Sequence, residues 1–137
     1  MSTAEDRVLS QMAEDILQMD PNREVTKVEE IGLQWAELDA AAGLLEETKK
    51  TLLAQLIQEK VQAAAAVGGN RPLPMNQAES LALADPRYEA HLRKMVDARK
   101  AANRAKVQYD SGRVKIELMR SLVAARREEM RLGGMRT

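Results

Sequence analysis

Few side chains in this sequence are suited to catalysis or to metal binding. The chain holds one histidine, His91, and no cysteine, which excludes thiolate chemistry and disulfides and leaves no recognisable ligand set for a transition metal. The acid pairs Glu46-Glu47 and Glu128-Glu129 are adjacent and so diverge around a helix, which suits solvation better than acid–base catalysis. Gly68-Gly69 lacks the lysine and hydroxyl partners of a phosphate-binding loop. The sequence therefore predicts a protein that is not an enzyme and uses no cofactor.

Basic side chains are the strongest chemical signal in the second half of the chain. Most lie off the apolar positions described below, and they are Arg87, Arg93, Lys94, Arg99, Lys100, Arg104, Lys106, Arg113, Lys115, Arg120, Arg126, Arg127 and Arg131. In a symmetric oligomer such cations repeat into a belt, where weak contacts to a polyanion add up. Single-stranded nucleic acid suits that belt, although only Tyr88 and Tyr109 could stack bases, and both occupy apolar positions. The alternative is a charged helix surface that is simply solvated.

Charge is divided unevenly between the two halves of the chain. The 137 residues carry a formal net charge of zero. Residues 1–66 hold 13 acidic and 6 basic residues, whereas residues 67–137 hold 8 and 15, so the halves carry −7 and +7. Two uses of this division remain open. Either the halves neutralise each other within or between chains, or the basic half faces a polyanion.

A repeating apolar pattern organises residues 85–132 into one long helix. Steps of alternately three and four residues select Tyr88, His91, Met95, Ala98, Ala102, Ala105, Tyr109, Gly112, Ile116, Met119, Val123, Arg126 and Met130. A seam of this width needs a partner helix to cover it. Asp85-Pro86 provides the cap and first helical residue, Asp110-Ser111-Gly112 is the weak point, and Gly133-Gly134 should end the helix. His91, on the seam, should be packed and hydrogen-bonded.

The first half of the chain predicts two further helices. Apolar residues within positions 1–19 form a short amphipathic helix that stops at Asp20-Pro21-Asn22. A longer helix should begin near Thr26, where Glu29 has capping-box spacing, and continue to Ala66. Its stripe consists of Ile31, Trp35, Leu38, Ala42, Leu45, Lys49, Leu52 and Leu56, widened by Leu44, Leu53, Ile57 and Val61. That breadth predicts contact with more than one neighbouring helix.

Glycine and proline mark the one clear linker. The predicted parts are an acidic helical half at residues 1–66, a Gly/Pro linker at 67–75 and a basic long-helix half at 76–137, all within one structural unit. Gly68-Gly69 ends one helix, while Pro72 and Pro74 delay the next, as in the turn of a helical hairpin. Asn76 then has the spacing of an N-cap for a short helix.

Targeting and membrane signals are not recognisable in the sequence. Glu5, Asp6 and Arg7 stand where a signal peptide would be basic and then apolar. No stretch of about 18 apolar residues follows. We therefore expect a soluble, cytoplasmic protein without membrane contacts.

Several segments together resemble a known group of proteins. They are residues 46–56 (EETKKTLLAQL), a glycine-containing loop, residues 78–85 (AESLALAD) and a long Ala-rich basic helix with residues 119–130 (MRSLVAARREEM) towards its end. They resemble small all-helical bacteriophage proteins that are often encoded among replication and recombination genes. Length and layout are similar to those of the UvsY-like recombination mediators, over about residues 45–131.

A UvsY-like resemblance implies a ring-forming protein of a bacterial host cell that binds single-stranded DNA and helps a recombinase displace a single-strand-binding protein. The family's basic contacts lie around a K-K-x-L-x-A-x-L helix, matched here by Lys49, Lys50, Leu52, Ala54 and Leu56. Gln55, Gln58 and Glu59 depart from the family's more basic pattern, and Lys60 and Arg71 are the nearest substitutes. The departure shifts expected DNA contacts towards the long helix. The predicted set is Lys49, Lys50, Lys60, Arg71, Arg93, Lys94, Arg99, Lys100, Arg104 and Lys106.

These observations predict an all-α protein of helical hairpins with long coiled-coil-like helices, oligomeric through two apolar seams. The predicted interface consists of Trp35, Leu38, Leu45, Leu52, Leu56, Tyr88, Met95, Tyr109, Ile116, Met119 and Val123. The first hypothesis is a phage recombination or replication accessory that self-assembles, binds single-stranded DNA and helps to load a recombinase. The alternative is a structural or adaptor coiled-coil protein, such as a phage assembly component or an inhibitor of a host protein, that does not bind nucleic acid.

Overall fold

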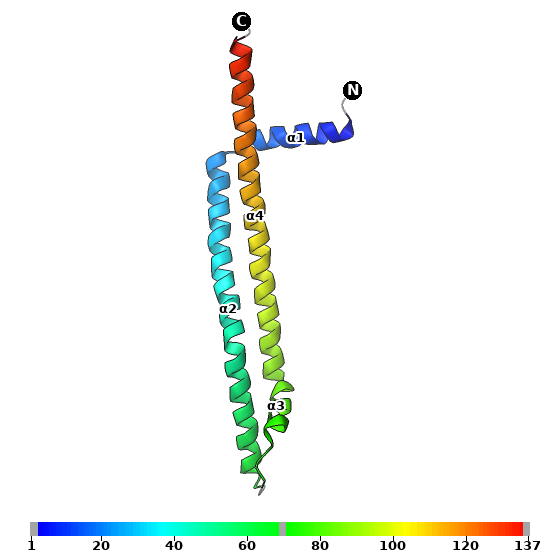
Figure 1. Cartoon of the computed structure of the whole chain (residues 1–137), viewed down its shortest axis with the longest axis vertical. Helices are drawn as coiled ribbons and strands as arrows, with labels where there is room; N and C mark the ends of the chain where they lie inside the picture. The colour runs from blue at the N-terminus through cyan, green and yellow to red at the C-terminus, as the bar shows by residue number, and fades with distance from the viewer. Residues whose placement is uncertain (1–2, 69–70, 136–137) are drawn as a thin grey trace. The chain divides into compact units, whose positions relative to one another are not determined.

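Four helices account for nearly all of the chain. The computed structural model describes residues 3–68 and 71–135, and these contain no strand (Figure 1). The helices are α1 (Ala4–Gln18), α2 (Pro21–Ala66), α3 (Met75–Leu83) and α4 (Pro86–Met135). Because 92% of the described residues are helical, the predicted all-α class is confirmed.

The chain divides into two compact units. The contiguous unit comprises residues 35–104, and the terminal unit comprises residues up to 34 together with residues from 105 onwards. Each unit therefore contains one segment of α2 from the acidic half of the sequence and one segment of α4 from the basic half.

Capping residues explain where the first two helices begin. Thr3 and Asp6 form a capping box at the start of α1, with each side chain accepting a hydrogen bond from the other residue's backbone N–H. The predicted end of this helix before Asp20 is confirmed. The predicted start of the second helix near Thr26 is wrong, because Asp20 accepts a hydrogen bond from the Asn22 N–H (3.1 Å) and Pro21 is already helical.

The ends of α2 and α3 follow from glycine and proline. Gly68 adopts a left-handed conformation with a φ of 84°, and its N–H donates to the Ala65 carbonyl oxygen, which closes α2. Gly69, predicted to share this role, lies outside the described residues. Helix α3 begins directly after Pro74, so the prediction of Asn76 as its N-cap is wrong. The Asn76 side chain instead accepts a hydrogen bond from the Gln77 N–H.

Helix α4 runs without a break from Pro86 to Met135. The predicted Asp85 cap is confirmed, since its carboxylate accepts a hydrogen bond from the Arg87 N–H at 2.8 Å. The helix also continues through Asp110-Ser111-Gly112. The predicted end at Gly133-Gly134 is wrong, because both glycines are helical; glycine costs a helix only about 1 kcal/mol and does not forbid it.

In the contiguous unit, α2 and α4 run antiparallel and α3 packs against both. Leu56 is the largest fully buried side chain and forms a cluster with Ala82 of α3 and Tyr88 of α4. Leu53 and Ile57 pack against this cluster, so the predicted contact of the widened stripe with more than one helix is confirmed there. Small side chains on α3 permit this close approach.

In the terminal unit, two glycines bring α2 and α4 close together. A Cβ atom added at Gly112 would lie 2.6 Å from Cγ2 of Val28, and one added at Gly32 would lie 3.0 Å from Cε2 of Tyr109. A Cβ at Gly112 would fit only if Val28 shifted, and one at Gly32 would require the Tyr109 ring to move by a few tenths of an ångström. The glycine that interrupts the apolar seam of α4 is therefore a packing position, where the partner side chain takes the space that a Cβ would fill.

Candidate functional site

The predicted DNA-contacting residues of α2 and the linker differ in their exposure and in their ion pairing. Lys49 is half-buried, whereas Lys50 and Arg71 are exposed. Lys60 forms a salt bridge with Asp85, with Nζ 2.9 Å from Oδ2. Of these four cations, Lys60 has its charge neutralised by a buried carboxylate within the same unit.

Arg99 of α4 is held by two carboxylates of α2. Its Nε lies 2.8 Å from Oε1 of Glu46, and its Nη1 lies 2.6 Å from Oδ1 of Asp39. The hydrogen bonds that Arg99 donates to Glu46 and Asp39 raise the pKa of Arg99 above its ordinary value, and the hydrogen bond from Arg99 lowers the pKa of Glu46. A phosphate would have to displace both carboxylates before it could bind this guanidinium.

A second ion-pair cluster joins the start of α4 to the end of α2. The Asp85 side chain is only 6% exposed, and it accepts hydrogen bonds from Lys60 and from the Nε and Nη2 of Arg87. Hydrogen bonds from Arg87 and then Lys60 hold the pKa of Asp85 far below its ordinary value. Arg87 also pairs with Glu59 of α2. The cluster fixes the point at which α4 begins and leaves no cation there for a ligand.

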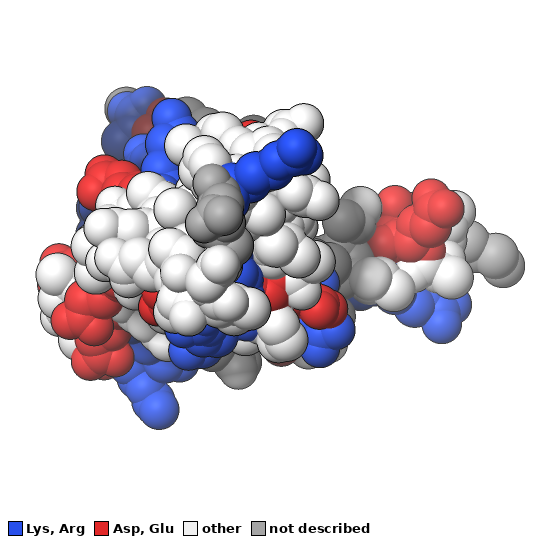
Figure 2. Space-filling model, turned by 90° about the horizontal axis from the view of Figure 1, so that it is seen from below, with Lys and Arg blue, Asp and Glu red and all other residues white. Residues whose placement is uncertain are grey.

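The remaining predicted DNA contacts of α4 are exposed. Arg93 pairs with Glu89 one turn earlier (2.8 Å). Lys94, Lys100 and Arg104 are exposed and take part in no ion pair among the described residues. Lys106 is also exposed. On the face shown in Figure 2, basic and acidic side chains adjoin each other, and no side of that face is covered by basic residues alone.

The terminal unit pairs opposite charges in the same way. Nζ of Lys115 on α4 lies 3.3 Å from Oε2 of Glu24 on α2. Burial would raise the pKa of Glu24, but Lys115 and Lys27 together hold it below its ordinary value. In both units, acids of α2 thus neutralise bases of α4, which accounts for part of the charge division without any ligand.

The predicted interface residues lie on sides of α2 and α4 that are covered within the chain. Buried members are Leu56, Tyr88 and Met119, and half-buried members are Trp35, Leu38, Leu45, Leu52, Met95, Tyr109, Ile116 and Val123. Seam positions past Val123 differ, since Arg126 and Met130 are exposed. His91 is packed and hydrogen-bonded as predicted, with Nε2 2.8 Å from the Leu45 carbonyl oxygen, to which it must donate. Tyr109 lies against Gly32, and the Arg113 guanidinium is 5.9 Å from its ring centre.

A second apolar stripe on α4 was missed by the sequence reasoning. In the terminal unit, Val107, Val114, Leu118 and Leu132 are exposed, with Val107 and Val114 each 64% accessible. Successive members are separated by sums of three- and four-residue steps, which places them on one side of α4. This side is about 200° around the helix axis from Ala105, Ile116 and Met119. The signal was present in the sequence as a second three-four repeat offset by two residues. We name these four residues the outer stripe.

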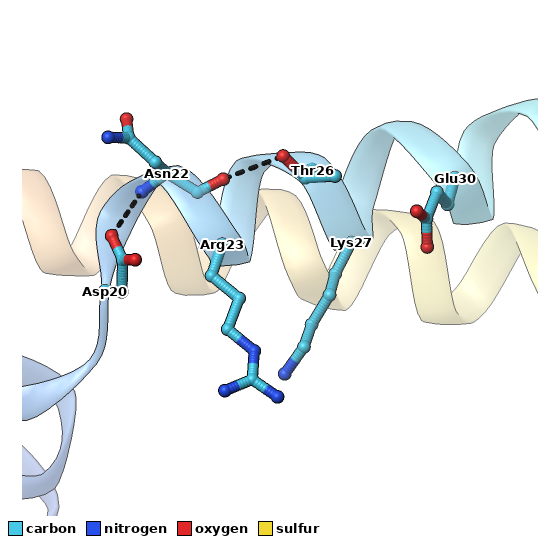
Figure 3. A pocket seen from close by; sticks show the side chains of 6 residues that line it. All are labelled: Asp20, Asn22, Arg23, Thr26, Lys27 and Glu30. Carbon is cyan, nitrogen blue, oxygen red and sulfur yellow. Dashed lines mark hydrogen bonds between the residues drawn. The ribbon is translucent and has the colours of Figure 1, made fainter.

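Metal-binding clusters and surface depressions are the remaining kinds of candidate site in the part of the chain that the structure describes. No group of three or more His, Asp or Glu side chains there could hold a metal ion. An open depression at the start of α2 is lined by Asp20, Asn22, Arg23, Thr26, Lys27 and Glu30 (Figure 3). The hydrogen bonds drawn there, from Asn22 N–H to Asp20 and from the Thr26 hydroxyl to the Asn22 carbonyl oxygen, belong to the first turn of α2.

The last two observations concern membrane-spanning helices and similarity to known proteins. Among the described residues, no helix is both long enough and apolar enough to cross a lipid bilayer. Comparison with known protein families, with curated proteins and with solved structures finds no match for this chain.

Proposed function

We propose that this protein is a non-enzymatic assembly protein, in which copies of an antiparallel, coiled-coil-like pair of α2 and α4 associate into a helical oligomer. Its role is then structural or adaptor-like, as a scaffold for other proteins. The observation that carries the proposal is the outer stripe of α4. Large apolar side chains that repeat along one face of a helix are typical of helix–helix contacts.

The small core supports the same proposal. Among the described residues the buried apolar set is Ile16, Val28, Ala42, Leu56, Ala78, Ala82, Tyr88, Ala102, Ala105 and Met119, half of it alanine. Two paired helices bury one stripe each, which provides little of the apolar burial that offsets chain entropy. Association through the outer stripe would add a second buried layer.

The proposal is tested by measuring the mass of the purified protein with size-exclusion chromatography and light scattering. An oligomer should give a multiple of the 15.2 kDa chain mass. Val114→Asp combined with Leu118→Asp should lower the mass towards that of the monomer, because two carboxylates cannot be buried in an apolar contact. Gln108→Asp, which adds a charge at an exposed position off the stripe, is the matched control and should leave the oligomer intact. A monomeric parent protein would refute the proposal.

A second candidate is the phage recombination accessory that binds single-stranded DNA and, as the UvsY-like resemblance implies, helps a recombinase to displace a single-strand-binding protein. The observation that favours it is the exposure of Lys94, Lys100 and Arg104 on one segment of α4 without ion pairs among the described residues. Such cations are available to phosphates, whereas Arg99 is not.

Fluorescence anisotropy of a labelled single-stranded oligonucleotide at two salt concentrations tests this candidate. Lys94→Gln, Lys100→Gln and Arg104→Gln together should weaken binding and flatten its salt dependence. Arg7→Gln with Arg23→Gln removes cations from the acidic half and is the control. Absence of binding by the parent protein at low salt would leave the assembly role alone.

A further inference from the structure

A groove in the terminal unit has an apolar floor and a basic rim. It measures about 350 Å³ and is lined by Pro21, Asn22 and Val25 of α2 and by Ile116, Met119, Arg120, Val123 and Arg127 of α4. Arg120 and Arg127 are exposed and form no ion pair among the described residues. None of the lining residues belongs to α1. The groove therefore offers apolar contacts and two available cations.

Helix α1 has an apolar face that the described residues of its own chain leave uncovered. Val8, Leu9 and Met12 are 58%, 63% and 52% exposed, whereas Ile16 at the other end of the helix is buried. A helix of 15 residues is marginal in water unless its apolar face is packed. The first turns of α1 therefore lack the contact that would stabilise them.

The charges of α1 complement those of the groove. Residues 4–18 carry four acids, Glu5, Asp6, Glu14 and Asp15, against the single base Arg7. At helical spacing Glu5 lies on the same face as Leu9 and Met12, and Asp15 lies beside Val8 and Met12. Each chain therefore carries both an apolar helix face flanked by acids, on α1, and an apolar groove flanked by bases. Opposite charges at the rim of the groove would favour the orientation of α1 that brings its carboxylates next to the arginines.

The connection from α1 to α2 is too short for α1 of the same chain to fold back over this groove without a sharp reversal. Only Met19 and Asp20 separate the two helices, and both are engaged in caps: the Met19 N–H donates to the Ile16 carbonyl oxygen, and Asp20 caps α2. The groove begins at Pro21, immediately after this connection. Folding α1 back over its own groove would require a sharp reversal within these two capping residues.

We propose that the groove between α2 and α4 binds helix α1 of a second copy, with Val8, Leu9 and Met12 on its apolar floor and carboxylates of α1 facing Arg120 and Arg127. This exchange rests on the proposed self-association and names one segment that makes it. Because each copy offers both the helix and the groove, two copies can exchange helices reciprocally or continue into a longer assembly.

Cysteine cross-linking in full-length chains tests the exchange, because the natural chain has no cysteine. A Met12→Cys chain is mixed with a Val123→Cys chain, treated with a short bis-maleimide and analysed by mass spectrometry of the mixed product. Cross-linking between copies should be at least several-fold more efficient than for Gln11→Cys mixed with Val123→Cys, since Gln11 lies on the polar face of α1.

The alternatives give different results in the same experiment. An oligomer in which the Met12→Cys chain cross-links no better than the Gln11→Cys chain would overturn the exchange while leaving self-association in place. A product formed only within one chain, in the Met12→Cys/Val123→Cys double variant, would show that α1 covers its own groove and would also overturn it. A parent protein that is monomeric at every concentration would refute both proposals.

Charge reversal tests the rim contacts independently. Arg120→Glu with Arg127→Glu should lower the yield of the mixed Met12→Cys and Val123→Cys product by roughly five- to tenfold. Introducing Glu5→Lys and Asp15→Lys into the Met12→Cys chain should restore it. Circular dichroism of each variant must show unchanged helix content, and an unchanged yield after reversal would exclude these ion pairs.

Discussion

At the scale of single residues, substitutions at two glycines can separate the effect of packing on stability from the effect of helix propensity. Gly112→Ala should destabilise the protein by about 1–2 kcal/mol, because overpacking against the buried, β-branched Val28 costs about 1–3 kcal/mol and outweighs the gain in helix propensity. Thermal unfolding followed by circular dichroism measures the change.

Gly43→Ala is the matched control for this substitution. Apart from the adjacent residues and the backbone of the helix itself, no atom lies within 4 Å of a Cβ built at Gly43. The change should therefore stabilise the helix by about 0.5–1 kcal/mol through propensity alone. Equal effects of the two substitutions would contradict the close approach of Val28 to Gly112.

The carboxylate of Asp85 should make stability depend on pH. Its pKa is lowered in the folded state, so its contribution is complete above about pH 4, where an unfolded aspartate is ionised, and declines as the pH falls towards the folded pKa. Asp85→Asn keeps a cap acceptor but loses the charge that pairs with Lys60 and Arg87. The variant should unfold at a lower temperature at pH 7, and its difference from the parent should shrink between pH 5 and pH 3.

Asp97→Asn provides the comparison for this pH series. Asp97 is an exposed carboxylate of α4, and no salt bridge involves it among the described residues. Its replacement should shift the unfolding temperature little at either pH. A similar pH dependence in both variants would show that the Asp85 contacts do not stabilise the fold.

The sequence could not predict which cations of α4 remain available to bind a ligand. Arg99 and Lys100 are adjacent and chemically alike, yet Arg99 meets Asp39 and Glu46 while Lys100 is exposed. The difference depends on the register between α2 and α4, which no local pattern encodes. His91 was predictable because its place on the seam is set by helical spacing alone.

At the scale of elements, the periodicity of apolar residues predicted the covered side of a helix correctly, whereas capping-box spacing did not predict where helices begin. The three-four repeat identified the covered side of α4 as far as Val123. In contrast, Thr26 has capping-box spacing inside α2, where its hydroxyl donates to the Asn22 carbonyl oxygen instead. Thr, Asn and Glu are tolerated within helices, so such spacings arise without a helix start. Proline is far more restrictive, and Pro21 and Pro86 both mark true first helical residues.

The continuity of α4 can be tested at its least helical segment. Ser111 is exposed within the unbroken helix. Ser111→Pro should lower stability by about 3 kcal/mol or more, because proline removes a helical hydrogen bond and clashes with the preceding turn. Thermal unfolding and helix content by circular dichroism are the measurements, with Ser111→Ala as a control that should be neutral or slightly stabilising. A proline that is tolerated would indicate a turn at this point.

At the scale of the whole molecule, self-association should appear in thermal stability as well as in mass. If association stabilises only the folded chain, the unfolding temperature rises with protein concentration by mass action. A hundredfold increase in concentration should therefore raise the midpoint of the parent protein by several degrees. The Val114→Asp/Leu118→Asp variant, without the outer stripe, should show a midpoint that depends less on concentration than that of the parent protein. The comparison separates the intrinsic stability of one chain from the stability contributed by association with other copies. A midpoint of the parent protein that does not depend on concentration would mean that the exposed apolar faces of α1 and α4 do not stabilise the fold through contacts between copies.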